Sequence, residues 1–228
     1  MHPIETSYPM ELVHMDFLTI GKPNTDKIIN ILIVMDHFTK YAQAYVTPNQ
    51  TAPVVARTLW ENFLVHYGWP TKILTDQGKC FESTLVKELC SIAQVQKIRN
   101  TPYHPETNGA CERFNSTLIN MLGTLPIESK KEWQDWVSTM THAYNCTISH
   151  ATGYKPYYLM YGHESRLTID VEYGVTMPTL TDNIRHNYVK KLQARLKWAF
   201  GNAKDFNQKE MNHHKQYYDR KIKCMMLS

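Results

Sequence analysis

The sequence predicts an α/β domain in which a mixed β-sheet is covered by helices. Three observations favour this fold class. The first 50 residues contain three consecutive strand-like segments joined by short turns, the next stretch alternates helical and strand-like patterns, and a long amphipathic pattern fills the C-terminal part. With 43% hydrophobic and 20% charged residues over 228 positions, the chain fits one substantial globular domain with some additional length.

The first three strands are expected to form an antiparallel meander. Residues 11–20 (ELVHMDFLTI) are rich in strand formers, and Ile28 opens the near-continuous apolar run IINILIVMDHF, which is typical of a buried strand. The segment YAQAYV from Tyr41 fits an edge neighbour of that strand. The polar segment GKPNTDK, with its Gly, Pro and Asn, predicts a turn between the first two strands.

Helices and strands then alternate. Apolar residues recur at helical spacing over 51–67 until Gly68-Trp69-Pro70, which predicts a helix that ends there. Residues 72–75 (KILT) read as a short buried strand, 83–94 as a helix capped by a serine, and 95–100 as another strand. Five strands in this order predict an RNase H-like mixed sheet flanked by helices.

The remaining chain is predicted to be helical. Helices are expected from Ala110 to about Leu125 and from Glu128 to about Ser149, followed by a short helix within YKPYYLMYGHESRL. From Thr181 onward, apolar residues at steps of three and four predict one long amphipathic helix. The expected organisation is a catalytic-type core over 1–160, a Pro- and Gly-containing linker over 161–180, and a basic helical extension over 181–228.

Charge is distributed unevenly along the chain. Residues 181–228 contain 11 Lys and Arg against 4 Asp and Glu, a net charge of +7. Residues 1–180 contain 14 against 17, a net charge of −3. A basic segment of this kind can bind phosphate groups, and a merely solvated helix face is the alternative interpretation.

Composition also argues against several classes of protein. No apolar run approaches the roughly 20 residues of a membrane span, and MHPIETSYPM lacks the layout of a signal peptide, so neither a membrane partner nor secretion is expected. The five cysteines form no CxxC pair. Disulfide frameworks and zinc knuckles are therefore not expected, and a reducing compartment is.

Three carboxylates stand at positions that suit catalysis. Asp16 lies in the middle of a strand, Asp76 directly follows a buried strand, and Glu112 lies early on a helix. Each also has an ordinary explanation: Asp16 as an exposed residue of an edge strand, Asp76 as a turn residue, and Glu112 as a surface residue of a helix.

Taken together, these positions can converge at one edge of the sheet. Three neighbouring carboxylates repel one another, and burying them unpaired costs several kcal/mol. Divalent cations remove that penalty, and carboxylate oxygens suit Mg²⁺ or Mn²⁺. Two such ions would stabilise the entering and leaving oxygens of a phosphoryl transfer. No Ser, Cys or His nucleophile stands in a recognisable catalytic setting.

The strings around these residues resemble the integrases of retroviruses and LTR retrotransposons, particularly those of gypsy-type elements. The interval from Asp76 to Glu112 contains 35 residues, as in the DD(35)E signature of that family. The resemblance covers about residues 1–220 and is carried by ELVHMDF, PTKILTDQGKCF, TPYHPETNGACERFNSTL and ATGYKPYYLMYG.

The resemblance implies roles for particular residues. Asp16, Asp76 and Glu112 correspond to the metal-binding catalytic triad. Tyr103 and His104 fall on the loop before the catalytic helix, where the family contacts DNA. Asn108 and Asn115 share the helix face of Glu112 and could hydrogen-bond the DNA backbone or orient Glu112, and Lys79 could contact phosphate. Asn108 has helix capping as an equally open alternative, and Lys79 has an ordinary surface role.

The implied activity is a divalent-metal-dependent polynucleotidyl transferase and endonuclease that needs two Mg²⁺ or Mn²⁺ ions and no small-molecule substrate. It frees a 3′-hydroxyl at the end of an element's DNA copy and joins it to target DNA. The expected partners are the DNA of the element ends, target DNA and further copies of the chain. The expected location is the nucleus, or the nucleus and the cytoplasm.

Two features of the family pattern are not found in the sequence. No His-His-Cys-Cys zinc module precedes the core, and no DNA-binding module follows it. Autonomous integration is therefore not expected, and the chain is interpreted as an element fragment or a domesticated host derivative. A non-catalytic module that binds nucleic acid or protein is the main alternative. An RNase H-like nuclease acting on RNA–DNA hybrids is disfavoured by the 35-residue interval.

Overall fold

The computed structural model describes residues 4–21, 28–99, 109–165, 167, 172–173 and 182–225. It divides into two compact units, Met1–Asn145 and Cys146–Ser228.

The first unit is built on a five-stranded mixed sheet. The strand order is β3-β2-β1-β4-β5, with β1, β2 and β3 antiparallel and both β4 and β5 parallel to the central strand β1. The predicted meander and five-stranded sheet are therefore confirmed. The strands are β1 (Leu12–Gly21), β2 (Ile28–Asp36), β3 (Ala42–Thr47), β4 (Lys72–Thr75) and β5 (Gln96–Arg99).

Strand β2 is buried on both faces. Leu32 and Val34 belong to one hydrophobic core, and Ile31, Ile33 and Met35 belong to the other. Side chains alternate between the faces of a strand, so only an unbroken apolar run can supply both cores. Burial on both faces therefore explains why every residue from Ile31 to Met35 is apolar.

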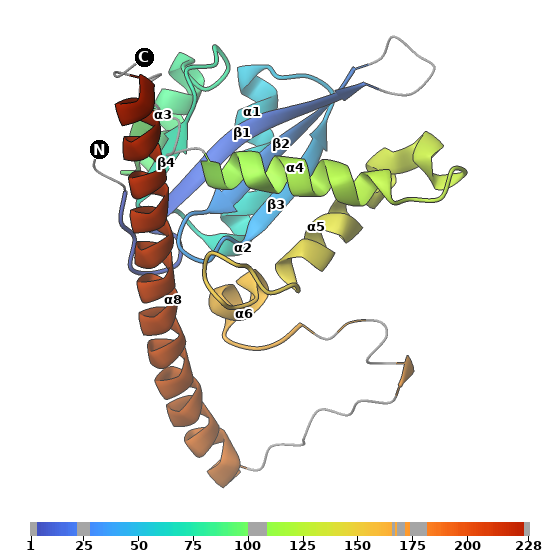
Figure 1. Cartoon of the computed structure of the whole chain (residues 1–228). Helices are drawn as coiled ribbons and strands as arrows, with labels where there is room; N and C mark the ends of the chain where they lie inside the picture. Colours follow the sequence, from blue (N-terminus) through green and yellow to red (C-terminus); the bar gives the residue numbers. More distant parts are fainter. Residues whose placement is uncertain are drawn as a thin grey trace. The chain divides into compact units, whose positions relative to one another are not determined.

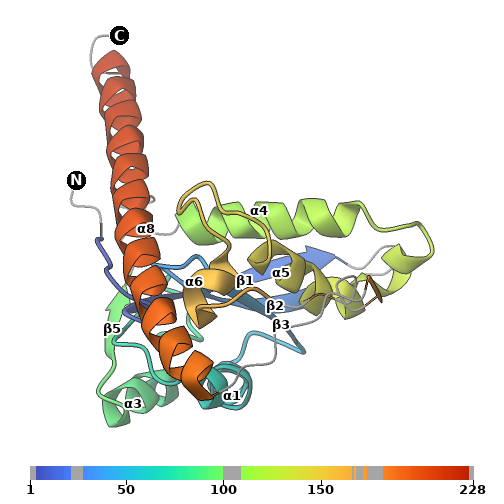
Figure 2. The same ribbon diagram turned by 90° about the horizontal axis from the view of Figure 1, so that it is seen from below.

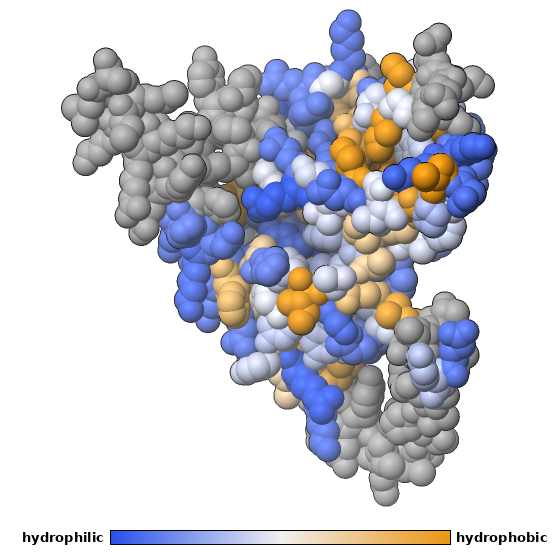
Figure 3. All heavy atoms as spheres, turned by 45° about the vertical axis from the view of Figure 1, so that its right-hand side comes forward, coloured by the Kyte–Doolittle hydropathy of each residue, from blue (hydrophilic) through white to orange (hydrophobic). Residues whose placement is uncertain are grey.

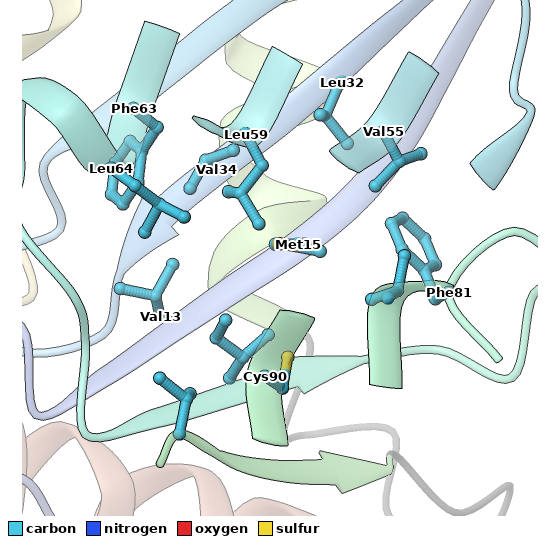
Figure 4. Packing of buried hydrophobic residues seen from close by; sticks show 13 residues of the cluster. Val13, Met15, Leu32, Val34, Val55, Leu59, Phe63, Leu64, Phe81 and Cys90 are labelled. Carbon is cyan, nitrogen blue, oxygen red and sulfur yellow. The ribbon is translucent and has the colours of Figure 1, made fainter. Parts of the chain in front are cut away.

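Helices cover both faces of the sheet, so the unit has three layers: helices, sheet and helices (Figures 1 and 2). One core lies between the sheet and a first helical layer, and Figure 4 shows its strand and helix side chains converging. The first layer consists of α1 (Ala52–Leu59), η1 (Trp60–Leu64), α2 (Val65–Tyr67) and α3 (Thr84–Ile92). The opposite face carries α4 (Gly109–Gly123), η3 (Ser129–Trp136) and α5 (Val137–Asn145).

Two predicted helices differ in detail from the structure. The helix over 51–67 is present, but its middle, Trp60–Leu64, is wound as a π-helix. The prediction of a single helix from Glu128 to about Ser149 is wrong. The structure has the 3₁₀ segment η3 followed by α5, and Glu132 has non-helical angles of φ −118° and ψ 40°. The stretch SKKE at 129–132 has no apolar residue that would hold a regular α-helix against the sheet.

The second unit combines α6 (Pro156–Tyr161) with the 44-residue α8 (Asp182–Met225), which confirms the long C-terminal helix. Gly162, at φ +76°, brings its backbone so close to Leu196 that an added Cβ would lie 2.9 Å from Cδ1. Asn202 Nδ2 donates a hydrogen bond to the Tyr154 hydroxyl at 3.1 Å. The unit therefore has packing of its own, while the proposed boundaries 1–160, 161–180 and 181–228 stay a prediction.

The described residues also show the character of the surface and the state of the cysteines. On the face in Figure 3, hydrophobic residues form separate groups among hydrophilic ones. None of the helices in the described part of the chain is both long enough and apolar enough to cross a bilayer. The four described cysteines, Cys80, Cys90, Cys111 and Cys146, are free thiols.

Candidate active site

Asp16 lies on the central strand of the sheet. It is paired with Ile33 of β2, and β4 flanks β1 on the other side. The edge-strand explanation for this carboxylate is therefore excluded. Met15 and Phe17 pack into the core under α1 and α3, whereas Leu18 packs into the core under α4. Because side chains alternate along a strand, Asp16 faces the α4 side.

Asp76 follows the strand next to Asp16. In the parallel pair of β1 and β4, Met15 stands opposite Thr75, so the next residues along both strands are Asp16 and Asp76. The carboxylate of Asp76 also shapes the turn, since its Oδ1 accepts a hydrogen bond from Gly78 N at 2.9 Å. A Cβ at Gly78 would lie 2.9 Å from that oxygen. The glycine therefore allows the turn to close around an exposed carboxylate.

Helix α4 carries the third carboxylate on the side of the sheet that Asp16 faces. Glu112 lies in its first turn, and buried Cys111 and Phe114 anchor that turn against the sheet. Asn115 Nδ2 donates a hydrogen bond to Asp16 Oδ2 at 3.3 Å. Since residues three apart in a helix share a face, the bond places Glu112 on the side of α4 that looks toward Asp16.

The pKa of Asp16 reflects the two carboxylates near it. Burial raises the pKa of its carboxyl above the ordinary value, and the neighbouring charges of Asp76 and Glu112 raise it further. Hydrogen bonds from Phe17 N, at 2.8 Å, and from Asn115 oppose this shift. Asp16 thus lies close enough to Asp76 and to Glu112 to be affected by the charge of each.

The donor set suits a hydrated divalent cation. Among the described residues, no three His, Cys, Asp or Glu side chains meet as a ready-made metal cage. Magnesium is usually held by one or two carboxylates and keeps several waters. Asn115 Oδ1 is buried with no hydrogen-bond partner, and it is an acceptor that a metal-held water would satisfy. The residues present therefore fit Mg²⁺ or Mn²⁺.

The predicted DNA contacts are only partly described. Lys79 is exposed in the turn that follows Asp76, and Asn115 contacts Asp16 as given above. Tyr103, His104 and Asn108 lie outside the described residues, so their roles stay predictions.

Sequence reasoning missed one buried carboxylate, Asp36, at the end of β2. Its oxygens accept hydrogen bonds from Met10 N at 2.8 Å, Thr39 N at 2.7 Å and Thr39 Oγ1 at 2.6 Å. Three donors inside the protein satisfy this group, so its role is to fix the turn into β3. The spacing of Asp and Thr in DHFT was the available signal, because Asp often hydrogen-bonds the backbone of its own turn.

Comparison with known proteins places this geometry in context. The family "Integrase core domain" matches residues 7–105. The retrovirus-related Pol polyprotein from transposon 412 of Drosophila melanogaster is 27% identical over 197 residues, which are 83% of this chain and 15% of that polyprotein. The chain spans 14–16% of the length of the first curated relatives that it matches.

Solved structures show the same fold. The simian T-cell lymphotropic virus intasome with the PP2A regulatory subunit B56 gamma contains a chain that aligns at TM-score 0.59 and 18% identity, over 79% of this chain and 62% of that one. The HTLV-2 integrase catalytic core in complex with magnesium, in its trimeric form, aligns at TM-score 0.53 and 15% identity, over 70% of this chain and all of that one. The predicted RNase H-like fold is thereby confirmed.

Proposed function

The chain carries an integrase catalytic core of the retroelement type, and on this premise we propose that it cuts and joins DNA as a divalent-metal-dependent polynucleotidyl transferase. Asp16, Asp76 and Glu112 are the proposed metal-binding catalytic residues. The observation that carries the proposal is that Asp16 on β1 lies beside Asp76 at the end of β4, and that Asn115, three residues after Glu112 on α4, hydrogen-bonds to Asp16. One part of the support comes from the HTLV-2 core, which was solved with magnesium.

The proposed residues have two roles: three carboxylates supply negative charge for the metal ions, and Asn115 positions one of these carboxylates. A bound pair of divalent cations would supply Lewis acidity at the scissile phosphodiester. Asp16 and Asp76 provide fixed anionic oxygens on neighbouring strands of a rigid sheet, and Glu112 adds a third from α4. Asn115 positions the Asp16 carboxylate through its hydrogen bond. Catalysis then rests on positioning and charge stabilisation.

The proposed partners follow from this chemistry. The substrates are the DNA ends of an element and target DNA, and the active form is a homo-oligomer. The trimeric form of the HTLV-2 integrase core supports the oligomer. Access to chromosomal DNA requires a nuclear location, which we include in the proposal. Since the chain spans about 15% of its polyprotein relatives, cleavage and joining are proposed for it, and autonomous integration is not.

The test is nicking and strand joining of labelled DNA oligonucleotides in Mg²⁺ or Mn²⁺. The wild-type chain should show activity that EDTA abolishes, and both Asp76→Asn and Glu112→Gln should reduce it by at least about 100-fold. Asp135→Asn and Glu88→Gln remove exposed carboxylates on η3 and α3 and serve as matched controls that retain activity.

Three results would count against the proposal. Activity that survives in Asp76→Asn, or that is absent with both metals, contradicts the transferase assignment. Preferential cleavage of an RNA–DNA hybrid would instead favour a ribonuclease of the same fold.

A further inference from the structure

Helix α8 carries a concentration of cations that nothing in the described protein neutralises. Between Lys191 and Lys204 the helix has four Lys and Arg and no Asp or Glu. All four side chains are exposed, and none forms an ion pair with a described carboxylate. The described ion pairs elsewhere use Glu82 and Glu164. An uncompensated cluster of this kind attracts a polyanion.

These cations fall on two different sides of the helix. Lys191 and Arg195 are four residues apart, and Trp198 follows three residues later, so the three share one face, called here the α8 stripe. Lys197 and Lys204 are seven residues apart and share another side, roughly 150° away at 100° per residue. The α8 stripe rises by about 10 Å from Lys191 to Trp198.

Trp198 gives the stripe a chemistry that charge alone does not. Its side chain is 67% exposed, although a large aromatic ring is normally covered in a folded protein. The ring is nonetheless held in one orientation by Tyr154. The two ring centroids are 6.3 Å apart and the ring planes are nearly perpendicular, at 88°. Tyr154 is in turn fixed by the hydrogen bond from Asn202 Nδ2 and stacks on Tyr158. An exposed, oriented indole beside two cations is therefore built into the second unit.

We propose that the α8 stripe binds single-stranded nucleic acid. Lys191 and Arg195 contact backbone phosphates, and an unpaired base stacks on Trp198. Bases within a duplex are already stacked on one another, so the indole distinguishes a single strand from a duplex, whereas the cations attract both. The binding needs none of the three carboxylates and so does not depend on the proposed transferase activity.

The experiment measures fluorescence anisotropy of labelled oligo(dT), and of the same strand paired with oligo(dA), with the full chain in EDTA. Trp198→Ala should weaken oligo(dT) binding about 5-fold or more and leave duplex binding nearly unchanged. Trp198→Phe keeps an aromatic ring and should therefore bind oligo(dT) nearly as tightly as the wild type. The double variant Lys191→Ala/Arg195→Ala should weaken binding of both probes. It should also reduce the slope of log K against log salt by about 1.4 for the single strand.

The matched control is Lys197→Ala/Lys204→Ala, which removes the same charge from the other side of α8. This control should change oligo(dT) affinity less than 2-fold, which is a smaller change in affinity than the loss of a phosphate contact causes. Equal losses in the two double variants would mean diffuse charge attraction and overturn the proposal. An unchanged affinity in Trp198→Ala, with the helical circular dichroism of the chain preserved, would overturn it too. The assay contains EDTA and measures no cleavage, so its outcome is separate from success or failure of the transferase proposal.

Discussion

At the scale of the residue, Asp16 shows a conflict between stability and the proposed function. Burial and two neighbouring carboxylates raise the pKa of its carboxyl. A carboxyl whose pKa is raised on folding stabilises the folded state fully only below its unfolded pKa. That contribution is lost as pH rises through the folded pKa. Without metal, ionised Asp16 therefore destabilises the protein at neutral pH.

We predict that Asp16→Asn stabilises the metal-free chain at pH 7 by about 1 kcal/mol, a size common for relief of such strain. The free energy of unfolding should be measured in urea with EDTA present, at pH 7 and at a pH below the ordinary pKa of an aspartate side chain. The gain should shrink at the lower pH, where Asp16 is protonated. Isothermal calorimetry should also show that Mg²⁺ binding is lost in the variant. A stabilised variant that still binds Mg²⁺ as wild type does would contradict the assigned role.

At the scale of the element, the outer strand β3 is held by a side chain from α5. Asn145 Oδ1 accepts a hydrogen bond from Ala42 N at 2.9 Å, and its Nδ2 donates one to Ala42 O at 2.7 Å. Asn145 is buried, and its side-chain amide makes with Ala42 the two hydrogen bonds that a neighbouring strand would make. This contact satisfies the outward backbone groups of Ala42 at the start of the edge strand.

Asn145→Ala should therefore lower the free energy of unfolding by about 2–4 kcal/mol, because two buried backbone groups lose their partners. Chemical denaturation measures the loss, and hydrogen exchange should increase at the Ala42 amide. Asn120→Ala, an exposed substitution on α4, is the control and should change stability by less than about 0.5 kcal/mol. Similar effects of the two substitutions would show that the edge contact contributes little.

At the scale of the whole molecule, the chain consists of two compact units with different chemistry. The first holds the sheet and the carboxylates, and the second holds the cations of α8 with its aromatic neighbours. Two glycines let α8 pack within its own unit. Gly153 lies against Phe206, and Gly162 lies against Leu192 and Leu196.

A pair of identical substitutions tests this packing. Gly162→Ala adds a Cβ at φ +76° and 2.9 Å from Leu196, and it should destabilise the second unit by about 1–3 kcal/mol. Gly201→Ala meets open space inside α8 and should stabilise the helix by up to about 1 kcal/mol. Hydrogen exchange resolved by unit should show the first change in α6 and α8 and not in β1–β3. Equal effects of the two variants would contradict the close packing at Gly162.

Local patterns in the sequence determined most of the elements. The two-sided apolar run of β2, the serine cap of α3 and the three-four spacing of α8 each depend on neighbours along the chain. The positions of Asp16, Asp76 and Glu112 on a strand, at a strand end and on a helix start were likewise available from spacing and resemblance. Only tertiary structure decided that β1 is the central strand, because strand order depends on contacts between distant segments.

The same limit explains what sequence reasoning missed. The Asn115 contact joins residues 99 positions apart, and the Asn145 contact joins residues 103 positions apart. The π-helical segment Trp60–Leu64 and the break at Glu132 also escaped prediction, because helical spacing in the sequence does not distinguish an α-helix from a π- or 3₁₀-helix. Sequence determined which chemistry the chain carries, because residue types and spacings are local. Tertiary structure decided which groups meet, because a hydrogen bond or a repulsion depends on distance in space.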